Sequence, residues 1–152
     1  MAVIRVAQTG DIDAIRDLLR EHDLRTEGIL ENSTRYWVAQ DGAALSGAIG
    51  LELGETSVLL RSAIVDPRWR GKGLGRELTA QALGWARAGG YMFAYCFSTD
   101  AGEYWVARGF CSCSVQDVVD ALPGSPQVEL FARLGWLATE EAFRIHLQPG
   151  DH

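Results

Sequence analysis

Runs of apolar residues, several of them alternating with polar residues, predict the strands of a β-sheet. Five such runs lie at residues 3–6, 36–39, 44–53, 58–65 and 142–147. Turn residues such as Asp41-Gly42 and Asp66-Pro67 close two of them. The run at 91–97 is apolar and aromatic without alternation, which favours a strand buried on both faces. Residues 110–115 are a further strand candidate.

Other segments carry apolar residues at helical spacing. Thr9-Gly10-Asp11 offers capping groups for a first helix, in which apolar residues recur at positions 12, 15, 18 and 19. A longer helix is predicted from about residue 76 to residue 88, where Gly89-Gly90 ends it, and shorter helices are predicted at 101–108 and 116–122. Residues 22–31 favour a loop or a short helix, and residues 129–136 are ambiguous. Because strands and helices alternate from end to end, we predict a single domain over residues 1–152, of the α/β (or α+β) class, around one mixed sheet.

Length, charge and cysteine content narrow the class of protein. A chain of 152 residues can bury a core without a metal or disulfide bonds. The formal net charge of −6 argues against a nucleic-acid partner, and the apolar runs are too interrupted to span a membrane. No signal-peptide pattern is visible, and the odd set Cys96, Cys111 and Cys113 is typical of buried free thiols in a reducing compartment. We therefore expect a cytoplasmic protein without a metal site.

One stretch of the chain carries a pattern with direct chemical meaning. Between an apolar strand and a helix, glycines occupy alternate positions at Gly71, Gly73 and Gly75. Three cations accompany these glycines: Arg70, Lys72 and Arg76. Glycines let a backbone pass close to a ligand, and the unpaired N–H groups of a helix's first turn bind phosphate oxygens. The stretch therefore predicts a pyrophosphate-binding site.

The spacing of these residues excludes two common nucleotide-binding loops. A Walker loop needs serine or threonine after its Gly-Lys pair, but Gly73 follows Gly71-Lys72 here. The dinucleotide fingerprint needs a third glycine at the position that Arg76 occupies. Arg70-x-x-Gly73-x-Gly75 instead matches the loop Q/R-x-x-G-x-G/A that is typical of the GNAT superfamily of N-acetyltransferases.

Other parts of the chain extend this resemblance over nearly its whole length. Val65-Asp66-Pro67 precedes the loop, Gly109-Phe110 follows it at the family's spacing, and residues 4–7 with Asp11 and Ile15 resemble the family's opening strand and helix. The resemblance implies one GNAT domain with a mixed, splayed central sheet of about six to seven strands, flanked by about four helices. It also implies that acetyl-CoA binds between the strands at 58–65 and 91–97.

The resemblance also implies a set of cofactor-binding residues. The backbone of Ile64 and Val65 would hold the pantetheine arm, and a backbone N–H near Ile64, where the family's strand carries a bulge, would stabilise the oxyanion. The pyrophosphate would be held by Arg70, Gly71, Lys72, Gly73, Leu74, Gly75 and Arg76. Ser98 and Thr99 complete the predicted cofactor set.

A finer resemblance points to bacterial acetyltransferases associated with arsenic resistance and to the acetyltransferase domain of glutamate N-acetyltransferases. The segments that carry it are Thr26-Glu27-Gly28, residues 50–53, residues 59–62, and Ser98-Thr99 with the helix that follows to Gly109-Phe110. One departure is Gly135-Trp136-Leu137, which replaces a Cys-Pro element expected in the arsenic-associated group. The resemblance implies a small, amino-acid-like amine as acceptor and, because dimers are common among such relatives, a homodimer.

Three residues are candidates for the chemistry of transfer. Glu52 is the candidate general base, because an alkyl ammonium with a pKa of about 10.4 must lose a proton, although it could instead face solvent. Tyr104 is the candidate acid for the leaving thiolate, since Trp105 stands where many family members have a tyrosine and Tyr104 points about 100° away from it. Arg61, in an otherwise apolar strand, either binds a carboxylate of the acceptor or forms an internal salt bridge with an acid such as Glu52 or Glu55.

Together these residues predict an acetyl-CoA-dependent N-acetyltransferase in which the amine attacks directly within a ternary complex. Two alternatives remain open from the sequence: a protein N-acetyltransferase, and a non-catalytic regulator that binds acyl-CoA. The regulator remains an alternative because Trp105 stands where many family members have a catalytic tyrosine.

Overall fold

The computed structural model describes residues 2–22, 24, 33–98 and 101–148. Contacts between residues divide the chain into two compact units, of which the first comprises Met1–Leu51 with Arg61–Gly84, and the second Glu52–Leu60 with Trp85–His152. Thr99, the Thr26-Glu27-Gly28 segment and most of the predicted loop or helix at 22–31 lie outside the described residues.

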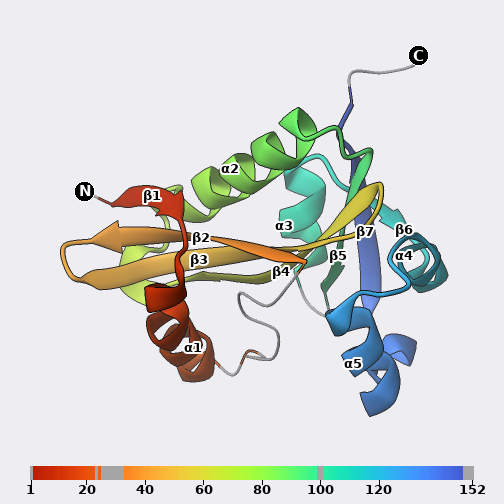
Figure 1. Cartoon of the computed structure of the whole chain (residues 1–152), viewed down its shortest axis with the longest axis horizontal. Helices are drawn as coiled ribbons and strands as arrows, with labels where there is room; N and C mark the ends of the chain where they lie inside the picture. The colour runs from red at the N-terminus through yellow and green to blue at the C-terminus, as the bar shows by residue number, and fades with distance from the viewer. Residues whose placement is uncertain (1, 23, 25–32, 99–100, 149–152) are drawn as a thin grey trace. The chain divides into compact units, whose positions relative to one another are not determined.

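Among the described residues, seven strands form one sheet in the order β1-β2-β3-β4-β5-β7-β6 (Figure 1). Antiparallel pairing joins β1 to β2 and joins β7 to both β5 and β6, whereas β4 and β5 run parallel. This mixture of directions confirms the predicted mixed sheet. The strands are β1 Val3–Val6, β2 Thr34–Asp41, β3 Ala44–Leu53, β4 Ser57–Val65, β5 Phe93–Ser98, β6 Cys111–Cys113 and β7 Glu141–His146.

The first unit is built on the helix that the apolar spacing predicts. Helix α1 spans Ile12–Glu21, and its apolar side, Ile15, Leu18 and Leu19, is buried. These side chains belong to a core cluster made of Ala7, Ile15, Leu18, Leu19, Tyr36, Val38, Ala48 and Ile64. The next helix, α2, spans Leu74–Ala88, so most of it belongs to the first unit, and it begins two residues before the predicted start.

The second unit contains three shorter helices and the core that they cover. They are α3 Gly102–Ala107, α4 Val115–Ala121 and α5 Pro126–Leu134. Helix α5 falls on the segment whose pattern is ambiguous, and its ends carry clear signals: Ser125 caps it, proline occupies its first position, and left-handed Gly135 terminates it. The core cluster consists of Leu59, Tyr95, Val118, Leu122, Val128 and Ala142.

The three cysteines are free thiols, but they differ in their surroundings. Cys96 on β5 is buried as predicted, and burial raises the pKa of its thiol. The prediction of burial is wrong for Cys111, which is exposed at the start of β6, a strand at the edge of the sheet. No helix among the described residues is long and apolar enough to cross a membrane.

Gly50 on β3 lies directly against a buried aromatic ring of the first unit. A Cβ atom built on Gly50 would lie 2.5 Å from Cζ and 2.7 Å from Cε2 of Tyr36. The Tyr36 ring is completely buried, so it has no free space to move into. Glycine at position 50 is therefore a packing requirement.

We expect Gly50→Ala to lower the free energy of unfolding by about 3 kcal/mol, because the added methyl group overlaps a ring that cannot move. Gly84→Ala is the matched control, since a Cβ at this position in α2 meets nothing within 4 Å. It should raise the free energy of unfolding by up to about 1 kcal/mol through helix propensity. Urea denaturation of both variants measures the difference, and equal effects of the two substitutions would contradict the packing argument.

Candidate functional site

The glycine-rich loop begins at a turn that hydrogen bonds hold in place. The backbone N–H of Asp66 donates to the carbonyl of Ser46 on β3 at 2.8 Å. The Asp66 carboxylate accepts from the backbone N–H of Arg68 at 2.9 Å and from its guanidinium, and these bonds hold the pKa of Asp66 below its usual range. The chain then forms one short 3-10 turn over Pro67–Trp69 before the glycines. The direction in which it leaves β4 is thus fixed.

Two glycines give the loop its course. Gly71 has a φ of +79° and Gly73 a φ of +81°, in the left-handed region that side chains with a Cβ avoid. A Cβ at either position would meet nothing within 4 Å. What glycine contributes here is backbone conformation, since space is available. Residues 70–73 are exposed, whereas Leu74 is buried and anchors the start of α2.

The first turn of α2 presents backbone donors. The N–H of Glu77 makes the first bond of the helix, to the carbonyl of Gly73 at 3.0 Å. The N–H groups of Leu74, Gly75 and Arg76 therefore have no carbonyl within the helix to bond, and the helix dipole places partial positive charge on them. This arrangement can bind the oxygens of one or two phosphate groups.

The cations of the loop lie close to the same turn in sequence. The Nζ atom of Lys72 lies 5.1 Å from the centre of the Trp69 ring, within the range of a cation–π interaction. The Nε atom of Arg70 donates to the carbonyl of Val65 at 3.3 Å. Arg76 is exposed on the first turn of α2. Residues 70–73 and Arg76 are thus exposed, and the three cations among them give this segment a positive charge.

Strand β4 is distorted shortly before the loop. Its parallel register with β5 runs from Ser57↔Phe93 to Leu60↔Cys96. Two residues after Leu60, Ser62 has a φ of +57°, which is rare for a residue with a Cβ and unusual inside a strand. The distortion lies two residues before Ile64, where the family resemblance places its bulge. Ala63 is exposed after it, and Ile64 is buried.

Arg61 is a buried cation next to this distortion. Its side chain is only 6% exposed, and its Nε atom donates to the Ser62 hydroxyl oxygen at 3.2 Å. The Ser62 hydroxyl also forms a hydrogen bond of 3.0 Å with the Tyr36 hydroxyl. Sequence reasoning gave Tyr36 and Ser62 no role in the site, although Ser62 lies in residues 59–62, one of the segments that carry the finer resemblance.

Glu52 lies near the end of β3 and is 1% exposed, so the interpretation that it faces solvent is wrong. Its carboxylate accepts hydrogen bonds from the Ser125 hydroxyl and, at 3.0 Å, from the backbone N–H of Gln127. Ser125 is at the same time the N-cap of α5, accepting from the N–H of Val128. The carboxylate therefore lies at the positive end of α5, where a negative charge is stabilised.

The remaining predicted residues lie around α3. Tyr104 is 37% exposed, its ring stands edge-on to that of Trp105, and the Arg108 guanidinium lies 5.2 Å from its centre. Trp105 points inward instead and packs against Phe110, which agrees with the predicted difference in direction. The hydroxyl of Ser98, at the end of β5, accepts from the backbone N–H of Ala101 at 2.9 Å.

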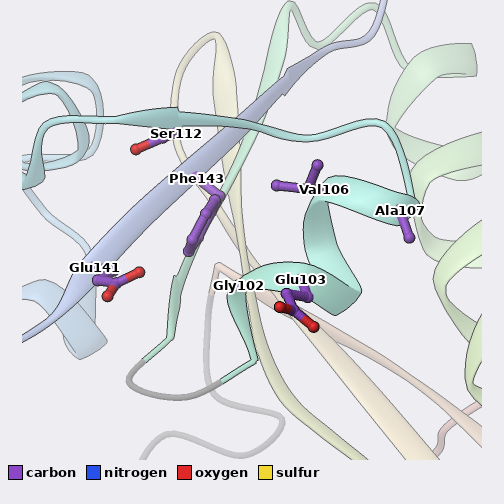
Figure 2. A pocket seen from close by; sticks show the side chains of 7 residues that line it. All are labelled: Gly102, Glu103, Val106, Ala107, Ser112, Glu141 and Phe143. Atoms are coloured by element: carbon purple, nitrogen blue, oxygen red, sulfur yellow. The ribbon is translucent and has the colours of Figure 1, made fainter.

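A hollow that sequence reasoning missed lies beside α3. It has a volume of about 690 Å³ and is lined by Gly102, Glu103, Val106, Ala107, Ser112, Glu141 and Phe143 (Figure 2). The lining residues on β7 could have been predicted from the sequence, because side chains along a strand alternate between its two faces and Glu141 and Phe143 therefore share one face. Ser112 of β6 pairs with Phe143. None of the predicted site residues lines this hollow.

Comparison with known proteins relates this geometry to a family. Residues 8–117 match the Acetyltransferase (GNAT) family. The chain is similar in structure to N-acetylglutamate synthase from Neisseria gonorrhoeae, complexed with coenzyme A and N-acetyl-glutamate, with a TM-score of 0.78 and 24% identity. The match covers 98% of this chain and 36% of that one, so the chain spans about a third of the synthase's length.

Two other solved structures match over almost their whole length. An acetyltransferase of the GNAT family from Staphylococcus aureus has a TM-score of 0.76 and 15% identity, and the match covers 97% of this chain and 99% of that one. A Mycobacterium tuberculosis protein in complex with CoA has a TM-score of 0.74 and 20% identity, with 95% and 99% covered. No curated protein matches the chain by sequence.

Proposed function

Because the chain belongs to the GNAT acetyltransferase family and so uses acetyl-CoA as its donor, we propose that it acetylates the primary amine of a small, amino-acid-like molecule. The observation that carries the proposal is the segment from Arg70 to Arg76. Its two left-handed glycines and the unpaired N–H groups of α2 suit the pyrophosphate of coenzyme A. The loop's cations, Arg70 and Lys72 among them, add attraction for the same group.

The acceptor class is supported by a relative and by a buried charge. The Neisseria gonorrhoeae synthase was crystallised with coenzyme A and N-acetyl-glutamate, the acetylated form of an amino acid. In our chain, Arg61 brings a guanidinium into an apolar strand, and a guanidinium binds a carboxylate through two parallel hydrogen bonds. An amino acid presents both the amine that would react and a carboxylate that Arg61 would bind.

The proposed reaction needs a base, an oxyanion donor and an acid. The ammonium loses a proton to Glu52, and because that carboxylate is buried, the proton passes through a water molecule. The free amine attacks the thioester carbonyl, and a backbone N–H near Ile64, beyond the distorted part of β4, stabilises the oxyanion. The C–S bond then breaks as the amide forms, the nitrogen passes its second proton to solvent water, and Tyr104 protonates the leaving thiolate and regains its proton from solvent.

The loop's role predicts how coenzyme A affinity changes with one substitution. Gly73→Ala should raise the dissociation constant for coenzyme A about tenfold, because alanine disfavours the left-handed conformation by about 1 to 2 kcal/mol. Titration calorimetry of the wild type and the variant measures this change. Gly124→Ala is the matched control, since it adds a methyl group to a loop of the second unit where a Cβ meets nothing within 4 Å.

Two outcomes would contradict this part of the proposal. A wild type that does not bind coenzyme A at millimolar concentration would refute the cofactor site, and unchanged affinity in Gly73→Ala would exclude the loop from it. Thiol release from acetyl-CoA with L-amino acids, polyamines and short peptides then tests the acceptor class. Release with free amino acids supports the proposal, and release with peptide amines alone would indicate a protein N-acetyltransferase instead.

Glu52→Gln should lower kcat at least tenfold near pH 7, because glutamine cannot take the proton of the ammonium. The loss should be smaller at pH 9, where more of the amine is already free. The amide oxygen can still accept from Ser125 and Gln127, so the fold should persist. Glu55→Gln, an exposed carboxylate three residues along the chain, is the control, and an unchanged rate in Glu52→Gln would remove Glu52 from the mechanism.

Arg61→Ala should raise the KM for a carboxylate-bearing amine such as L-glutamate between about tenfold and a hundredfold and leave the KM for acetyl-CoA unchanged. With 1,4-diaminobutane, which has no carboxylate, the substitution should have little effect. Arg133→Ala on the exposed side of α5 serves as the control. Steady-state kinetics measures the KM values for L-glutamate, 1,4-diaminobutane and acetyl-CoA, and an equal rise in the KM values for L-glutamate and acetyl-CoA would count against a carboxylate-binding role.

A further inference from the structure

A part-buried hydrogen bond between two hydroxyl groups connects β2 to the distorted part of β4. The Tyr36 hydroxyl lies 3.0 Å from the Ser62 hydroxyl oxygen, and Ser62 is the strand residue with a φ of +57°. A serine in this conformation is disfavoured, because its Cβ crowds the following carbonyl. A residue held in such a conformation inside a strand needs interactions that favour it over the extended one.

The position of the Tyr36 hydroxyl is set by packing. The ring is completely buried, and it lies so close to Gly50 that a Cβ there would come within 2.8 Å of three ring atoms. Close packing on this side restricts the ring to one place. The hydroxyl at its tip is therefore a fixed partner for Ser62.

The same serine also orients the neighbouring cation. The Nε–H of Arg61 can only donate, so the Ser62 oxygen accepts from it at 3.2 Å. The hydroxyl of Ser62 thus takes part in two hydrogen bonds, one with Tyr36 and one with Arg61. The serine makes both interactions in its left-handed conformation.

We propose that Tyr36 is a positioning residue that holds Ser62 in the left-handed conformation, and that this conformation directs the backbone of Ile64 and Val65 toward the pantetheine arm. The inference rests on the proposed function, which assigns that arm to these two residues. Tyr36 itself is completely buried, so the proposal gives it no direct contact with coenzyme A. Its effect on binding passes through the backbone of β4.

The test uses glycine as a replacement for the missing support. Tyr36→Phe removes the hydroxyl and keeps the ring against Gly50, so it should raise the dissociation constant for coenzyme A roughly fivefold, the factor expected for one hydrogen bond. In a Ser62→Gly background the same substitution should change it by less than about twofold, because glycine adopts the left-handed conformation without support. Titration calorimetry with coenzyme A measures all four proteins. A purely structural role of the hydroxyl would lower the melting temperature equally in both backgrounds and would produce no such rescue.

Tyr95→Phe is the matched control, since Tyr95 is also a buried tyrosine whose hydroxyl is hydrogen-bonded, to Arg144, and its loss should leave coenzyme A binding unchanged. Equal effects of Tyr36→Phe in both backgrounds, or no effect in the Ser62 background, would overturn the inference.

If Tyr36→Phe does not fold, Ser62→Ala should still bind coenzyme A more weakly than Ser62→Gly, and equal or reversed affinities would overturn the inference. A wild type that binds no coenzyme A would instead refute the proposed function, and the inference would fail with it.

Discussion

The candidate site depends on a backbone that leaves its regular conformation at three defined positions. Between the middle of β4 and the start of α2, Ser62, Gly71 and Gly73 are left-handed. Each of them changes the direction of the N–H groups that follow, which in a regular strand would bond to neighbouring strands. Glycine adopts this conformation at little energetic cost, whereas serine requires support, and the buried hydroxyl of Tyr36 supplies a hydrogen bond at that position.

The buried carboxylate of Glu52 is a second constraint on the fold, and the N-terminus of α5 stabilises it. A carboxylate as deeply buried as that of Glu52 is unfavourable unless donors surround it. The hydroxyl of Ser125 and the N–H of Gln127 provide such donors, and both belong to the first turn of α5. The same contacts cap the helix, so the carboxylate and α5 stabilise each other. The proposed role of Glu52 as general base would therefore require a water molecule to carry the proton to its buried carboxylate.

Local patterns in the sequence were sufficient to predict helices α1 to α4, the mixed sheet and the loop, whereas the segment that forms α5 was ambiguous. Helix α1 and residues 70–76 follow from spacing alone, because helical periodicity and left-handed glycines are properties of neighbouring residues. The environment of Glu52 could not be predicted in this way, since its donors lie 73 and 75 residues further along the chain. The conformation of Ser62 could not be predicted either, because serine has no special preference for it and its partner Tyr36 is 26 residues away.

Recognition in this chain is divided between backbone and side chains, and the division explains why the donor could be identified from the sequence more readily than the acceptor. Every residue of a helix's first turn carries the same N–H donor, so phosphate binding requires of the sequence little more than glycines where φ is positive and some positive charge. The acceptor must instead be distinguished from other amines by particular side chains. In the proposed function, the buried guanidinium of Arg61 would select a ligand that carries a carboxylate. Under that proposal, the identity of the acceptor depends on a few buried groups whose environment is created by the fold, and such groups leave little trace in local sequence patterns.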